Sequence, residues 1–266
     1  MPEIKFPLFN AEEKYHEAYL IMIDILGFSN AIIASEFRTI YDTIADIFNM
    51  RDDGNITFSL QDEQYNLAKS GQQFTGGKFY KPRITIFSDT IFICIPDDAL
   101  VEIPKDIVPS HRYIEFSAHH ILFQMCYYIW LTQRSLLKHG FLSRGAMSYG
   151  QIYTENGMWF GPAIIHAAKS EKEEAIYPRV ILHKTVFEKL KITTLQSAKS
   201  DIVIDSDGKH YCDYLAFDNV AEITNQEILQ ITINQLTHLS DERAKEKWQW
   251  LHDKLKTSVN AVEVTC

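Results

Sequence analysis

The chain has 266 residues, 46% hydrophobic and 12% aromatic, which is enough apolar material for one large core or two small ones. A formal net charge of -9 works against binding nucleic acid over a broad surface. The four cysteines form no CxxC pair, which argues against a disulfide framework or a zinc site and favours a reducing, cytoplasmic protein. We expect no signal peptide and no membrane span, because the sequence has no basic, then hydrophobic N-terminal pattern and no sufficiently long apolar run.

The first apolar run of the chain carries a single carboxylate, Asp24. The run predicts a buried strand that delivers this carboxylate to its end, because an unpaired carboxylate is costly to bury. At such a position an aspartate either caps the following helix or holds a metal. A second stretch, 83–94, has two short apolar runs around Ser88 and Asp89, which predicts a tight hairpin. Two aspartates on adjacent strands can hold one divalent cation.

The rest of the chain predicts a mixture of helices and strands. Apolar residues at helical spacing predict helices over 29–50 and 111–139. Residues 51–81 are polar and rich in glycine, which predicts a loop-rich insertion. Further on, the patterns predict two strand-like runs around an Asn-Gly turn within 141–159 and a helix over 163–174 after Gly161-Pro162. A strand over 178–182 and a helix over 184–190 are expected next. The remaining patterns predict a hairpin about Asp-Gly within 201–217 and a polar helical tail over 225–255.

This mixture predicts an α+β fold with helices on a central, largely antiparallel sheet. We divide the chain into a lead-in over 1–18, a main domain over 19–217 with the insertion near 51–81, and a C-terminal helical extension over 218–266.

Four motifs follow one another in the order seen in the class III nucleotidyl cyclases, which this chain resembles from about 19 to 182. The motifs are Asp24-Ile-Leu-Gly-Phe, Ser88-Asp89, Arg144-Gly-Ala-Met-Ser-Tyr-Gly and Gly161-Pro-Ala-Ile-Ile-His-Ala-Ala-Lys169. The resemblance implies a ferredoxin-type sandwich and a nucleoside triphosphate substrate. It also implies that Asp24 and Asp89, with Ile25 as a further metal-binding position, hold two Mg²⁺ or Mn²⁺ ions on that triphosphate, for which hard oxygen ligands are suited.

The same resemblance places Gly27 and Phe28 at a turn where the backbone approaches the triphosphate. The simpler alternative is an ordinary turn from strand to helix. Ser88 stands where the family keeps a glycine, and a serine can occupy a hairpin turn.

The base pocket departs from that of the purine cyclases. Thr85 and Met158 stand where those enzymes read adenine with a lysine and an aspartate. Arg83 shares a strand face with Thr85 by the period of two, so it can face a carbonyl of a smaller base. The alternative for Arg83 is an exposed cation at a strand end.

The transition-state asparagine and arginine of the family correspond to Ile165 and Lys169. Ile165 cannot replace the asparagine, whereas Lys169 can neutralise phosphate charge as a point cation without the bidentate geometry of arginine.

The segment from Gly161 to Arg179 looks like that of the pyrimidine cyclases of bacterial Pycsar antiphage defence. This resemblance implies a homodimer with composite sites, in which Asp24 and Asp89 of one subunit act with Lys169 of the other. It implies cyclisation of UTP, or CTP second, to a cyclic nucleotide that acts on a separate effector protein. The charge run beginning at Glu171 is interpreted as a solvated helix face, and Arg179 as a structural cation.

Two rival functions stay open. One is a purine cyclase whose base pocket is misaligned, and the other is a catalytically inactive cyclase-like module that only binds a nucleotide or a partner. The absence of the asparagine favours the second rival, while the presence of both aspartates counts against it.

Overall fold

The computed structural model describes residues 14–33, 37–49, 57–59, 75–78, 82–97, 110–155, 157–190, 202–216, 218 and 220–263. Its strands are β1 (His16–Leu26), β2 (Thr57–Ser59), β3 (Thr75–Lys78), β4 (Arg83–Phe87), β5 (Thr90–Pro96), β6 (Leu142–Ile152), β7 (Val180–Leu182), β8 (Ile202–Ile204) and β9 (His210–Cys212). Its helices are α1 (Phe28–Ile33), α2 (Phe37–Asn49), α3 (Ser110–Lys138), α4 (Pro162–Glu174), α5 (Lys184–Leu190), the 3-10 turn η3 (Val220–Glu222), α6 (Asn225–His238) and α7 (Glu242–Glu263).

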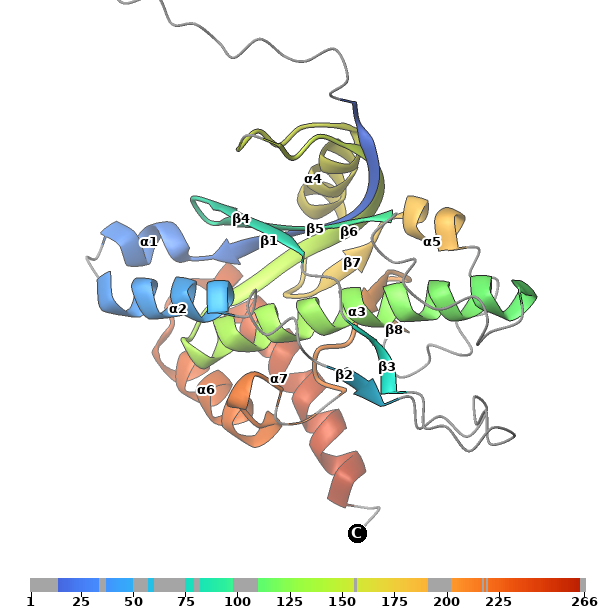
Figure 1. Ribbon diagram of the computed structural model, residues 1–266. Coiled ribbons are helices and arrows are strands. Elements are labelled where there is room, and N and C mark those ends of the chain that lie inside the picture. Colours follow the sequence, from blue (N-terminus) through green and yellow to red (C-terminus); the bar gives the residue numbers. More distant parts are fainter. Residues whose placement is uncertain are drawn as a thin grey trace, which may run out of the picture.

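A seven-stranded sheet in the order β4-β5-β1-β6-β7-β9-β8 forms the centre of the fold (Figure 1). The central strand β1 pairs antiparallel with both β5 and β6, and only the β6–β7 pair is parallel. The predicted α+β fold with a mostly antiparallel sheet flanked by helices is therefore confirmed.

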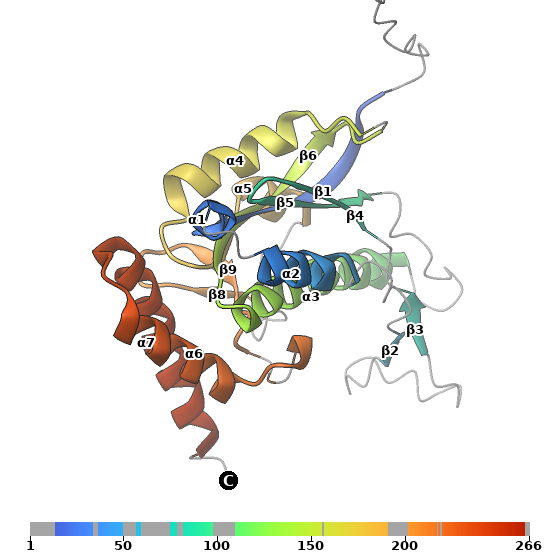
Figure 2. The ribbon, with the colours of Figure 1, turned by 90° about the vertical axis from the view of Figure 1, so that its left-hand side faces the viewer.

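Strand β1 is buried on both faces, which explains its nearly continuous apolar run. Its odd-numbered residues from Tyr19 to Ile25 belong to the larger core, which α3 covers, while Ala18, Leu20 and Met22 face the smaller core beneath α4. Figure 2 shows α4 on one side of the sheet and α2 and α3 on the other. Because side chains alternate along a strand, Asp24 projects from the α4 face.

Several elements differ from the sequence-based expectations. The helix expected over 29–50 is two helices, α1 and α2. The second strand-like run of 141–159 is only an isolated bridge between Tyr153 and Phe160, whose rings stack with centroids 4.9 Å apart. Within 51–81, the described residues include the paired strands β2 and β3.

The C-terminal tail is two helices because it contains two helix-capping residues. Thr224 begins α6 with a capping box that includes Glu227. Asp241 then accepts hydrogen bonds from the amides of Arg243 and Ala244, which begins α7. Within the described ranges, none of the helices is long and apolar enough to cross a membrane.

Candidate functional site

The two aspartates singled out in the sequence lie at neighbouring strand ends. Asp24 is opposite Thr90, the first residue of β5, and Asp89 lies in the two-residue turn between β4 and β5. The amide of Ile25 donates to the carbonyl of Asp89 over 2.7 Å, which ties this turn to the end of β1. The sheet pairing therefore brings together the two segments that carry Asp24 and Asp89.

The carboxylates of this region influence one another. Burial raises the pKa of Asp24; the nearby Arg144 opposes this effect, and the charge of Asp89 adds to it. Burial likewise raises the pKa of Glu171, again opposed by Arg144 and reinforced by Asp24. Such mutual repulsion between carboxylates is relieved when a cation binds between them.

Arg144 is the cation of this cluster. It lies directly opposite Asp24 on β6, with its Nε 3.6 Å from Asp24 Oδ2 and its Nη2 2.7 Å from Glu171 Oε1. Its Nη1 also donates to the carbonyl of Ala175 over 3.4 Å. Arg144 thus connects the end of β1 with the last turn of α4.

No role for Arg144 was predicted from the sequence, and the prediction that Glu171 lies on a solvated helix face is wrong. Glu171 is only 7% exposed, not part of a solvated face. It follows the buried Ala163 and Ala167 at intervals of four residues, so helical periodicity within α4 was the signal that could have placed it inward. For Arg144, the signal was a lone charge within a buried strand.

Asp24 and Asp89 suit a divalent cation that is bound together with a polyphosphate. Both offer the hard carboxylate oxygens that Mg²⁺ and Mn²⁺ prefer. No group of three or more His, Cys, Asp or Glu side chains that could hold a metal ion occurs among the described residues. Mg²⁺ often uses one or two carboxylates and completes its shell with water and substrate phosphates. Ile25 could add only backbone oxygen, since its side chain is buried in the core.

Gly27 turns the chain from β1 into α1. Its φ of 80° lies in the left-handed region, and a Cβ built on it meets nothing within 4 Å, so the space beside this backbone is open. Phe28 is 3% exposed, and its ring packs edge-on against Phe141 with centroids 5.8 Å apart. Only the backbone of Phe28 is therefore available to a ligand.

The predicted base-reading residues lie on the same sheet face as Asp24. Thr85 pairs with Phe92, which pairs with Met22 of β1, two residues before Asp24. Arg83 lies two residues further from the turn, and its Nη1 donates to Thr154 Oγ1 and to Glu155 Oε1, each over 2.5 Å. Ser88 occupies the turn with a φ of 58°, which explains why a glycine suits this position.

Lys169 is exposed on α4, two residues before Glu171. Two positions correspond to about 200° around a helix, so Lys169 lies on the side opposite to the one from which Glu171 meets Arg144. Ile165, one turn before Lys169, is also exposed, at 66%. Within a single chain, the structure therefore does not bring Lys169 to the Asp24 cluster.

Comparison with known proteins gives matches to solved structures alone. No protein-family model and no curated protein sequence matches the chain. The catalytic core of a rhodopsin-guanylyl cyclase with converted specificity, in complex with ATPalphaS, has a TM-score of 0.39 and 12% identity, over 75% of this chain and 96% of that one. The monomeric guanylyl cyclase domain of the RhoGC fusion protein from the aquatic fungus Blastocladiella emersonii has a TM-score of 0.39 and 13% identity, over 74% and 94%. A bacterial light-regulated adenylyl cyclase has a TM-score of 0.38 and 14% identity, over 92% and 59%.

Proposed function

We propose that this protein is a nucleotidyl cyclase that converts UTP, or CTP second, into the 3′,5′-cyclic nucleotide and pyrophosphate. The observation that carries the proposal is the meeting of Asp24 and Asp89 at adjacent strand ends, beside Arg144. The order of the four cyclase-like motifs agrees with it. In the reaction, the ribose 3′-oxygen loses its proton and bonds to the α-phosphorus, and the bond from that phosphorus to the bridging oxygen of the leaving pyrophosphate breaks.

The residues of the site have separate roles in this proposal. Asp24 and Asp89 hold the divalent cations, with Ile25 as a further ligand position. Bound Mg²⁺ or Mn²⁺ lowers the pKa of the 3′-hydroxyl and neutralises charge on the departing pyrophosphate. The open backbone at Gly27 and Phe28 faces the phosphates. Arg144 forms ion pairs with the carboxylates of Asp24 and Glu171. When the triphosphate binds, Arg144 replaces one of these ion pairs with a contact to a phosphate oxygen.

The base is read by Thr85 and Arg83. Thr85 can donate or accept a hydrogen bond, whereas Arg83 only donates. Both contacts of Arg83 to Thr154 and Glu155 use Nη1, so its other N–H groups can turn to a base carbonyl. A donor at this position favours uracil, whose O4 accepts, over cytosine, whose N4 donates. We therefore place UTP ahead of CTP.

The active form is a homodimer with composite sites in the cytoplasm. The exposed side of α4 carries Ile165 and Lys169, and Phe87 at the end of β4 is 79% exposed. Single exposed apolar side chains are ordinary on a protein surface, so the homodimer rests on the resemblance to the cyclases. In the dimer, Lys169 supplies a point cation to the site of the partner. The cyclic product is a second messenger of antiphage defence that acts on a separate effector protein.

A catalytically inactive nucleotide-binding module is the second candidate. It is favoured by Ile165, which stands where the related enzymes have a transition-state asparagine and cannot form its hydrogen bonds. A purine cyclase is disfavoured by Thr85 and Met158, which replace the charged pair that reads adenine.

One experiment separates these functions. The purified protein is incubated with equimolar UTP, CTP, ATP and GTP and Mn²⁺, and the products are identified by mass spectrometry. We expect cyclic UMP from the wild type, no product from Asp24→Ala or Asp89→Ala, and full activity from the exposed control Asp253→Ala. A dominant cyclic AMP or cyclic GMP peak would support the purine cyclase. Nucleotide binding without any product would support the inactive module.

A further inference from the structure

The C-terminal helix α7 presents a polar face to the sheet. Lys247, Trp250 and Lys254 are spaced at i, i+3 and i+7, so they lie on one side of this helix. The buried Trp248 and Leu251 lie beside them and join the larger core. The helix therefore contacts the domain through an apolar side and an adjoining side that carries two lysines.

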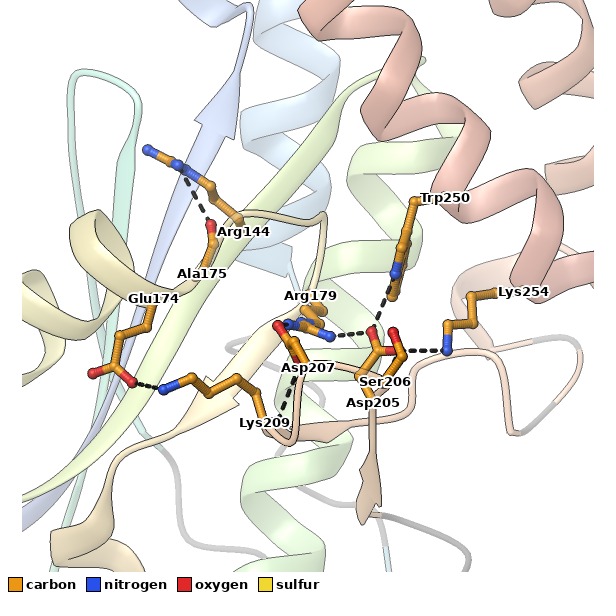
Figure 3. A network of polar contacts seen from close by, with 10 residues as sticks. All are labelled: Arg144, Glu174, Ala175, Arg179, Asp205, Ser206, Asp207, Lys209, Trp250 and Lys254. Carbon is orange, nitrogen blue, oxygen red and sulfur yellow. Dashed lines mark hydrogen bonds and ion pairs between the residues drawn. The ribbon is translucent and has the colours of Figure 1, made fainter.

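This second side is fixed to the β7–β9 end of the sheet. The indole ring of Trp250 stacks on Tyr177, with centroids 5.7 Å apart and planes 9° apart, and its Nε1 donates to Asp205 Oδ2 over 3.1 Å. Lys254 Nζ donates to Asp205 Oδ1 over 2.8 Å (Figure 3). The fully buried Arg179 pairs with the same carboxylate and lies 5.9 Å from the Trp250 ring. We call Tyr177, Arg179, Asp205, Trp250 and Lys254 the α7 clamp.

The α7 clamp adjoins the Asp24 cluster. The carbonyl of Ala175 accepts a hydrogen bond from Arg144 (Figure 3). Tyr177 follows two residues later, in the same segment between α4 and β7. Trp250 stacks on Tyr177, and Lys247 lies one turn earlier on α7, close enough to Arg144 and Asp24 for their charges to act on it.

Lys247 is near the Asp24 cluster, but no carboxylate of that cluster forms an ion pair with it. Its side chain is half-buried, and burial, followed by the charge of Arg144, lowers the pKa of Lys247, while Asp24 opposes this. No carboxylate of the described ranges forms an ion pair with it within 4.0 Å, although Lys245 on the same helix pairs with Glu242. Two cations side by side repel each other, and an anion that binds between them removes this repulsion.

We propose that Lys247 is a phosphate-binding residue of the active site, carried by α7 of the same chain to the β- and γ-phosphates of the bound triphosphate. The inference rests on the proposed cyclase function, which it extends. In this proposal Lys247 and Arg144 together supply the positive charge beside the carboxylates of Asp24, Asp89 and Glu171. The C-terminal extension is then a working part of the site, and Trp250 is a positioning residue that acts through Lys247.

Binding of inorganic tripolyphosphate in the presence of Mn²⁺, measured by calorimetry, tests this assignment. We expect Lys247→Met to weaken binding by about tenfold or more, the loss that one charged hydrogen bond produces, and to raise KM for the triphosphate. Lys247→Arg should keep most of the affinity. The matched control is Lys256→Met, which removes an exposed lysine nine residues further along α7, on the opposite side of the helix.

Trp250→Ala supplies a second, independent comparison. It should also weaken tripolyphosphate binding, and the double variant Lys247→Met/Trp250→Ala should bind no more weakly than Lys247→Met, because both changes remove the same contact. If circular dichroism shows that Trp250→Ala has lost the fold, the difference between Lys247→Met and Lys247→Arg decides alone.

The outcomes separate this inference from the proposed function. Tripolyphosphate binding that depends on Lys247, in a protein that cyclises no nucleotide, supports the binding role and overturns the cyclase. Cyclisation with an unchanged KM and unchanged tripolyphosphate affinity in Lys247→Met overturns the binding role alone. Absence of tripolyphosphate binding by the wild type also overturns it.

Discussion

Gly145 lies at the closest approach of β6 to β1. A Cβ built on it would be 2.1 Å from the carbonyl oxygen of Met22, a backbone atom that cannot move aside without disturbing the pairing. We expect Gly145→Ala to lower the free energy of unfolding by about 3 kcal/mol or more, at or beyond the upper end of overpacking costs. Urea denaturation measures the change.

Gly157→Ala is the control variant for this prediction. Gly157, unlike Gly145, has a positive φ, 74°, and a Cβ there meets nothing within 4 Å. Its replacement should cost only about 1 kcal/mol, from backbone strain alone. Equal losses in the two variants would show that the contact with Met22 does not limit the approach of the strands.

At the scale of elements, Asp205 joins the β8–β9 hairpin to both β7 and α7. Its side chain is 2% exposed and pairs with the fully buried Arg179. Removing one partner of a buried pair leaves the other charge uncompensated, so Asp205→Ala should destabilise the protein by about 3 to 5 kcal/mol. Asp207→Ala should cost less, because Asp207 is 33% exposed. Urea denaturation at pH 7 of both variants checks the order.

This pair also gives the fold an acid-sensitive element. Burial by itself would raise the pKa of Asp205, but the hydrogen bonds from Lys254 and the Ser206 amide and the charge of Arg179 hold it below the ordinary value. A lowered pKa in the folded state means that the stabilisation is complete above about pH 4, the unfolded value, and is lost as pH falls through the folded value. The difference in stability between wild type and Asp205→Ala should therefore shrink at pH 3. A constant difference would contradict this assignment.

At the scale of the whole molecule, composite sites predict complementation between inactive subunits. Asp24→Ala and Lys169→Ala should each be inactive as homodimers. In a twofold dimer, their heterodimer contains one site with both defects and one with neither, so an equal mixture should recover roughly a quarter of wild-type activity. Cyclic nucleotide formed after subunit exchange is the measurement.

The control mixture combines Asp24→Ala with Asp89→Ala. Both changes affect ligands from the same subunit, so each site of the heterodimer keeps a defect and no activity should return. Recovery in this control, or none in the first mixture although the subunits exchange, would contradict the shared site.

Local patterns were sufficient to predict much of the fold. The 184–190 helix and the hairpin around Ser88 depend on nearby residues, and the structure contains both. The hydrogen-bond partners of Arg83, by contrast, are Thr154 and Glu155, which lie more than 70 residues further along the chain. Only the register of the sheet brings these residues together.

For the same reason, only part of the candidate site could be predicted from the sequence. Asp24 and Asp89 each end an apolar run, which is visible in the sequence. Glu171 stands in a charge run, and although helical periodicity could have indicated its burial, its charged partner Arg144 is distant in the sequence. No sequence pattern gives a signal for the stacking of Trp250 on Tyr177, which holds this side of α7 against the segment between α4 and β7.

The position of β1 at the centre of the sheet has a consequence for synthesis. The ribosome makes β1 first, yet its two neighbours, β5 and β6, begin only at Thr90 and Leu142. Ile152, the last residue of β6, follows Asp24 by 128 residues (152 − 24), which takes about 6 to 26 s at typical elongation rates. During that interval β1, which is buried on both faces in the finished fold, lacks at least one of its two neighbouring strands. A chaperone that shields this nascent segment would therefore raise the yield of folded protein, and slow codons between β1 and β6 would lower it.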